Sequence, residues 1–190
     1  MKKVKISFII LVSMVFLAAF SRLIPHLPNF SPLGAIALFG AAHFYEKWKA
    51  FLIPIIATWL SDLVLNNTLY AAYYDGFTWF YSGFYWQYGS YLLIVLFGLS
   101  LFKKITISRT IGGIAMSTIV FFLVSNFGVW IGGAMYPKTF EGLIACYSAA
   151  IPFAQGTLYG NLIYSTVLFG GYYFIQLGFP AVRARYIKYS

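Results

Sequence analysis

The side chains that could do chemistry in this sequence are one carboxylate and several amides, and they lie within or beside long apolar stretches. Asp62 has Thr58 and Asn66 on the same helical face, because positions three to four residues apart are neighbours on a helix. Amides and aromatic rings accompany it elsewhere, at Gln87, Asn126, Trp130, Tyr159 and Asn161. Polar groups in apolar surroundings are costly unless they face protein or water, so these residues mark the functional interior of the protein.

Catalysis has less support in the sequence. It contains no GxxxxGK[ST], HExxH or GxSxG motif, and its only two histidines are His26 and His43. The single cysteine, Cys146, is interpreted as a packed thiol. We therefore expect no enzyme, no cofactor and no metal site.

The composition predicts a membrane protein. Hydrophobic residues make up 61% of the 190 residues and charged residues only 9%, against about a quarter for soluble domains. A soluble enzyme or a nucleic-acid-binding module is excluded.

Six apolar stretches predict an all-α, six-transmembrane-helix bundle that forms one domain over residues 1–190. A helix needs roughly 20 apolar residues to cross the hydrocarbon core. The expected spans are about residues 6–24, 32–45, 50–66, 86–102, 110–133 and 157–178. The second is short, so its outer end is expected below the surface. Residues 2–21 also fit a cleaved secretory signal, which would leave the other five spans in place.

The distribution of cations predicts an N-in, C-in topology, because basic residues collect on the cytoplasmic side. With six spans, eleven of the 13 cations fall inside: Lys2, Lys3, Lys5, Lys47, Lys49, Lys103, Lys104, Arg109, Arg183, Arg185 and Lys188. Only Arg22 and Lys138 fall outside.

Two segments between the spans are unusually apolar. Residues 67–85 are rich in aromatic side chains, Trp79 among them, which suits a cap over an outer pocket. Residues 134–155 suit a re-entrant or interfacial segment. Small residues four apart, such as Gly156 and Gly160, allow backbones to approach closely, either for packing within the chain or for docking of a partner helix. We expect packing within the chain.

The amides and Asp62 gather toward the outer side, which predicts an outward-facing pocket closed by packing below. The expected pocket residues are Asp62, Asn66, Trp79, Gln87, Asn126, Trp130, Tyr159 and Asn161. Two simpler interpretations remain open: Asp62 pairs with Arg22 or caps a helix end, and the asparagines only join helices.

Several sequence segments resemble an uncharacterised family of small bacterial integral membrane proteins that is similar to the substrate-binding (S) components of energy-coupling-factor transporters. They are PNFSPLGAIALFG at 28–40, Ser61-Asp62, SNFGVW at 125–130, YPKT at 136–139 and AIPF at 150–153. The resemblance covers about residues 22–169.

This resemblance implies a six-helix bundle that binds a vitamin-like molecule near the outer face. Its implied partners are a small-molecule ligand, membrane lipid, a transmembrane coupling protein and cytoplasmic ATPases, with no nucleic acid. The N-terminal histidine of metal-type members is missing here. Two alternatives remain: a non-transporting scaffold of a cell-envelope assembly, and an intramembrane lipid-modifying enzyme that depends on Asp62 or Cys146.

Overall fold

The protein is helical throughout the part that the computed structural model describes, which is residues 2–179 and 182, with side chains from residue 6 onward. The main helices are α1 (Lys2–Phe20), α2 (Leu33–His43), α3 (Lys47–Asn67), α4 (Phe84–Leu101), α5 (Ile107–Gly132), α6 (Phe140–Ser165) and α7 (Gly171–Gly178). Three short helical turns are η1 (Ser21–Leu23), η2 (Ala71–Tyr73) and the π-helical η3 (Thr166–Gly170). No strand occurs in the described residues, so the all-α prediction is confirmed.

Four segments of the described chain are long and apolar enough to cross a membrane. They are Ile6–Leu23, α3, α4 and α5. This set fits a membrane protein. The other two predicted spans fall on α2, which has only 11 residues, and on the helix that ends at Gly178.

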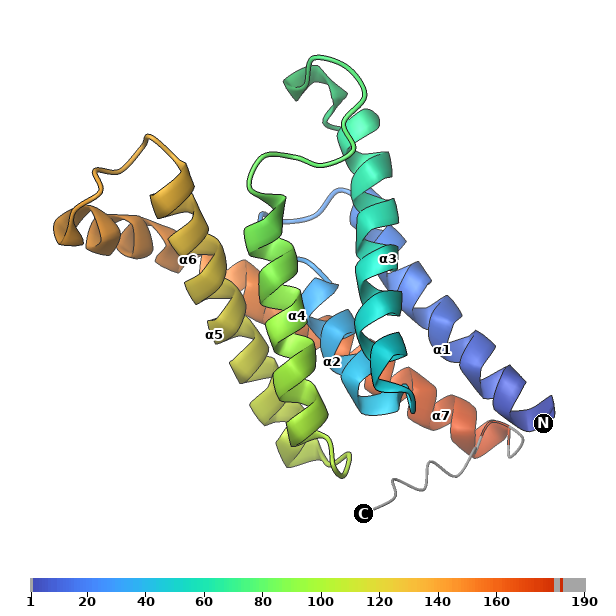
Figure 1. Cartoon of the computed structure of the whole chain (residues 1–190). Coiled ribbons are helices and arrows are strands. Elements are labelled where there is room, and N and C mark those ends of the chain that lie inside the picture. Colours follow the sequence, from blue (N-terminus) through green and yellow to red (C-terminus); the bar gives the residue numbers. More distant parts are fainter. Residues whose placement is uncertain (1, 180–181, 183–190) are drawn as a thin grey trace.

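Helix α2 lies at the centre of the bundle and contacts α1, α3, α4, α5 and α6 (Figure 1). Ten of its 11 residues are buried, which explains why it is apolar on every face. Its neighbours approach closely through glycine: a Cβ at Gly98 would lie 2.7 Å from Cβ of Ala41. The central position of this short helix allows five other helices to surround it.

Helix α6 differs from the predicted segment 134–155 and from the predicted start of the sixth span at residue 157. It begins at Phe140, where Thr139 accepts a hydrogen bond from the Gly142 amide at 3.2 Å, and continues through η3 into α7. Pro152 lies inside it. A proline removes one backbone donor but does not end a helix that packs on both sides of it.

The first half of α6 projects sideways from the bundle in Figure 1 and passes behind α5. The Tyr147 hydroxyl donates to the Leu123 carbonyl at 2.7 Å, and the rings of Tyr147 and Phe122 lie 5.6 Å apart. Residues 140–152 are therefore helical and contact α5 where the two helices cross.

The two ends of the bundle differ in charge. Lys47, Lys103 and Lys104 lie together at one end, called here the lysine end, where α7 also ends (Figure 1). Arg22 and the aromatic-rich loop lie at the other, called here the Arg22 end. The predicted inner cations Arg183, Arg185 and Lys188 lie outside the described residues, as do the side chains of Lys2, Lys3 and Lys5.

Candidate functional site

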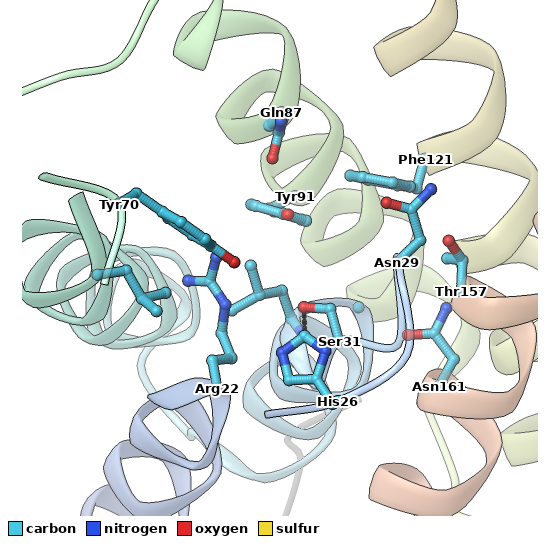
Figure 2. Close-up of a pocket in the computed structure, with 13 residues that line it drawn as sticks. Arg22, His26, Asn29, Ser31, Tyr70, Gln87, Tyr91, Phe121, Thr157 and Asn161 are labelled. Carbon is cyan, nitrogen blue, oxygen red and sulfur yellow. Dashed lines mark hydrogen bonds between the residues drawn. The ribbon is translucent and has the colours of Figure 1, made fainter. Parts of the chain in front are cut away.

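A cavity of about 200 Å³ lies at the Arg22 end (Figure 2). Residues of the five helices α2 to α6, of η1, of the loop after α3 and of the segment 24–32 enclose it. Its lining residues are Arg22, His26, Asn29, Ser31, Leu33, Gly34, Leu65, Tyr70, Gln87, Tyr91, Phe121, Thr157 and Asn161. Drug-sized ligands occupy about 300–1,000 Å³, so this cavity suits a smaller molecule.

Arg22 is the cation of the cavity, and Asp62 fixes it in place. Its Nη1 donates to Oδ1 of Asp62 at 2.6 Å and to Oγ of Ser61 at 2.9 Å. The other carboxylate oxygen of Asp62 accepts from the Tyr88 hydroxyl at 2.6 Å. Asp62 is only 4% exposed and has both oxygens engaged, so its role is to orient Arg22.

Arg22 lines the cavity and has donors that the described residues do not use. A guanidinium has five N–H groups, and within the described residues only its Nη1 is bonded. Figure 2 shows the side chain reaching toward Tyr70 and Tyr91. A guanidinium held on one side and free on the other is well suited to a carboxylate or phosphate.

Asn161 forms the opposite wall. Its Nδ2 donates to the hydroxyls of Ser117 and Thr118, both at 3.1 Å. Its Oδ1 is buried and has no hydrogen-bond partner in the described part of the chain. A Cβ at Gly34 would lie 2.3 Å from this oxygen, so a larger residue there would displace the Asn161 amide. A buried acceptor without a partner is suited to an N–H or O–H donor of a ligand.

Aromatic rings close the cavity between these polar walls. Tyr91 of α4 and Phe121 of α5 stack with their centroids 5.8 Å apart and their planes at 6°. In the neighbouring loop, burial and then the nearby Tyr91 and Asp62 raise the pKa of the Tyr81 phenol above its ordinary value. That phenol is therefore neutral at pH 7, and Arg22 and Asp62 provide the formal charges at the site.

A turn at residues 27–30 brings the segment 24–32 over the cavity. The Phe30 amide donates to the Leu27 carbonyl at 3.0 Å, with Pro28 and Asn29 between them. Asn29 has φ 59°, a left-handed conformation that asparagine tolerates better than most residues. Proline followed by a residue of positive φ is typical of a type II turn. This turn places Asn29 and Ser31 in the cavity wall.

Four of the predicted site residues lie in or beside the cavity. Gln87 and Asn161 line it, and Asp62 lies behind Arg22. Asn66 is buried one turn from Asp62 and accepts from the Tyr74 hydroxyl at 3.5 Å. Asp62 therefore pairs with Arg22, as the simpler interpretation expected, and this pair lies beside a cavity.

The other four predicted residues lie elsewhere. Asn126 donates to the Phe122 carbonyl of its own helix, and Trp130 donates to the Pro137 carbonyl in the turn before α6. Trp79 stacks against Trp59 at 6.4 Å, and Tyr159 is exposed.

Helix rotation explains two of these displacements. Residues follow one another at about 100° around a helix, so Asn126 lies about 140° from the cavity residue Phe121. Tyr159 lies about 160° from both Thr157 and Asn161, on the opposite face of α6. Both residues lie within two turns of cavity residues on the same helix, but their side chains face away from the cavity.

The sequence reasoning did not select Arg22, Thr157, Asn29 or Ser31. Arg22 had a signal: it is one of only two cations on the predicted outer side. The other, Lys138, donates to the carbonyls of Trp130 and Gly133 at the end of α5. Arg22 is largely buried, and a buried cation needs a partner, which for Arg22 is Asp62.

Nothing in the described residues groups three or more His, Cys, Asp or Glu side chains as a metal site. The polar groups among the residues that line the cavity include a guanidinium, amides and hydroxyls.

Comparison with known proteins gives a family. No curated protein and no solved structure matches the chain. A family model does match it, over residues 2–182 and thus nearly the whole length. The chain therefore belongs to DUF6580, a family of unknown function.

Proposed function

We propose that this protein is the ligand-binding subunit of a membrane uptake system and captures a small, vitamin-like organic anion. The observation that carries the proposal is Arg22, with one face of its guanidinium held by Asp62 and the other open to a small cavity. The Oδ1 of Asn161 has no hydrogen-bond partner among the described residues, which favours a ligand that also carries an O–H or N–H donor, as a hydroxy acid or an amino acid does.

In this proposal the chain crosses the bacterial inner membrane six times, with both termini inside. The Arg22 end then faces outward and the lysine end faces the cytoplasm. The charges of the described residues support this orientation, because the lysines cluster at one end of the bundle. The cavity would take its ligand from the outer side, as in S components of energy-coupling-factor transporters.

Transport would require partners. The sequence has no nucleotide-binding motif, so energy would come from cytoplasmic ATPases through a transmembrane coupling protein. One observation favours the scaffold alternative: the exposed start of α6 presents Phe140, Ile144 and Ile151, which another membrane helix could cover. Purification in mild detergent separates the two, since co-isolation of ATPases supports uptake and co-isolation of envelope-assembly proteins supports the scaffold.

Native mass spectrometry of the protein purified from membranes tests the proposal directly. We expect a retained small molecule that is released on unfolding and is anionic at neutral pH. Purified protein that never carries such a molecule, and takes up none from a mixture of small organic acids and phosphates, would contradict ligand capture.

The sign of the ligand charge is tested by Gln87→Glu. Gln87 lines the cavity and is half-buried, and glutamate has nearly the same shape. A second carboxylate in the wall should weaken retention of an anion by at least about tenfold, which corresponds to about 1.4 kcal/mol. The matched control is Gln155→Glu, because Gln155 is exposed and does not line the cavity. Stronger retention in Gln87→Glu would mean that the ligand is a cation.

A further inference from the structure

A second cavity, of about 560 Å³, lies at the lysine end between the α2–α3 and α4–α5 connections. Three lysines, Lys47, Lys103 and Lys104, are among its lining residues. Most of the others are apolar, with Phe44, Leu99 and Phe102 among them. The cavity thus combines three cationic residues with a mainly apolar wall.

Acidic residues of the chain do not neutralise these lysines. The sequence has four acids, Glu46, Asp62, Asp75 and Glu141. Glu46 pairs with Lys49, and Asp62 pairs with Arg22 at the opposite end. Asp75 lies in the aromatic-rich loop and Glu141 in the first turn of α6. An anionic group bound at these three lysines would therefore not compete with an acidic side chain of this protein.

An apolar groove of about 830 Å³ continues from this cavity, and His43 and Ile105 line both. The groove runs between the start of α5 and the η3–α7 region, past Ile111, Ile114 and Phe169. Gly170 also lines it, and a Cβ added there would meet nothing within 4 Å. A cationic cavity that opens into a long apolar groove matches a ligand with an anionic head and a hydrocarbon chain.

We infer that this end of the protein binds an anionic phospholipid. The headgroup phosphate lies among Lys47, Lys103 and Lys104, and one acyl chain lies in the groove along α5 and α7. Basic pockets between membrane helices on the cytoplasmic side are suited to anionic headgroups. This site is separate from the Arg22 cavity and does not depend on the ligand proposed there.

The headgroup is tested on protein freed of lipid in a neutral detergent. We expect native mass spectrometry to show retention of dioleoylphosphatidylglycerol and little retention of dioleoylphosphatidylcholine. Lys103→Gln and Lys104→Gln should each lower phosphatidylglycerol retention about fivefold. Lys49→Gln is the matched control, because Lys49 lies near the same end but pairs with Glu46 and does not line the cavity. Equal retention of both lipids would overturn the inference.

The acyl chain is tested by filling the groove. Gly170→Leu should lower phosphatidylglycerol retention with no change in charge, whereas Gly112→Leu should not, since residue 112 also meets open space but lines neither cavity. Inorganic phosphate is the second probe and should compete only weakly. Full competition by phosphate, together with unchanged retention in Gly170→Leu, would show a site for a free anion and overturn the lipid assignment.

Discussion

Arg22→Met is expected to abolish retention of the anionic ligand and to lower the free energy of unfolding by about 3–5 kcal/mol. Methionine retains the unbranched apolar stem of the arginine side chain but has no charge. The carboxylate of Asp62, a residue that is 4% exposed as a whole, is then left without its cation. A buried charge that has lost its partner carries most of its desolvation cost. Thermal unfolding in detergent measures the stability, and native mass spectrometry measures the retained ligand.

A second substitution separates stability from binding. In Arg22→Met with Asp62→Asn no charge is left uncompensated, and the amide can still accept from Tyr88. We expect the double variant to regain most of the lost stability and none of the ligand retention. Recovery of both would mean that the cation serves only the fold, and the proposed ligand class would be wrong.

Asp62→Asn alone should have the smaller structural effect. The Arg22 side chain is 16% exposed against 6% for Asp62, so an unpaired Arg22 remains closer to solvent. Ligand retention should weaken because the guanidinium loses the partner that orients it, while membrane insertion stays intact. Comparison of the three variants assigns the ligand contact to Arg22 and the positioning role to Asp62.

The sequence predicted the helices well where apolar length decides the outcome. The bounds predicted for the second, third, fourth and fifth spans differ by at most three residues from α2 to α5. The predicted sixth span begins at residue 157, whereas α6 begins at Phe140. Packing on α5 through Tyr147 stabilises that helix, and a tertiary contact of this kind is not visible in local sequence.

The sequence predicted at which end of the bundle the site residues lie, but not which helix face carries them. Asp62, Gln87 and Asn161 were selected because polar groups in apolar surroundings need partners, and the structure gives each of them a place at or behind the cavity. Which face a helix turns inward depends on its packing. The outward side chain of Asn126 and the inward one of Phe121 follow from the contacts of α5 with α4 and α6.

The segment 24–32 links the fold to the cavity, because it contributes lining residues and packs on two glycines of α6. A Cβ at Gly156 would lie 2.2 Å from the Pro28 carbonyl oxygen. A Cβ at Gly160 would lie 2.7 Å from the Ser31 nitrogen. Both contacts are with backbone atoms, which cannot move aside as the end of a flexible side chain can. The predicted use of Gly156 and Gly160 in close packing is therefore confirmed.

Gly156→Ala and Gly160→Ala are each expected to cost about 1–3 kcal/mol of stability, the usual effect of an added methyl group in a tightly packed site. Because the displaced segment carries Asn29 and Ser31, ligand retention should fall as well. Gly112→Ala is the matched control: its Cβ meets open space, and alanine favours a helix by roughly 1 kcal/mol over glycine. The midpoint of thermal unfolding and the amount of retained ligand should thus both fall in the α6 variants. Neither should fall in the control. Wild-type values for both α6 variants would mean that the segment does not need these glycines, and that the wall it forms is not fixed by α6.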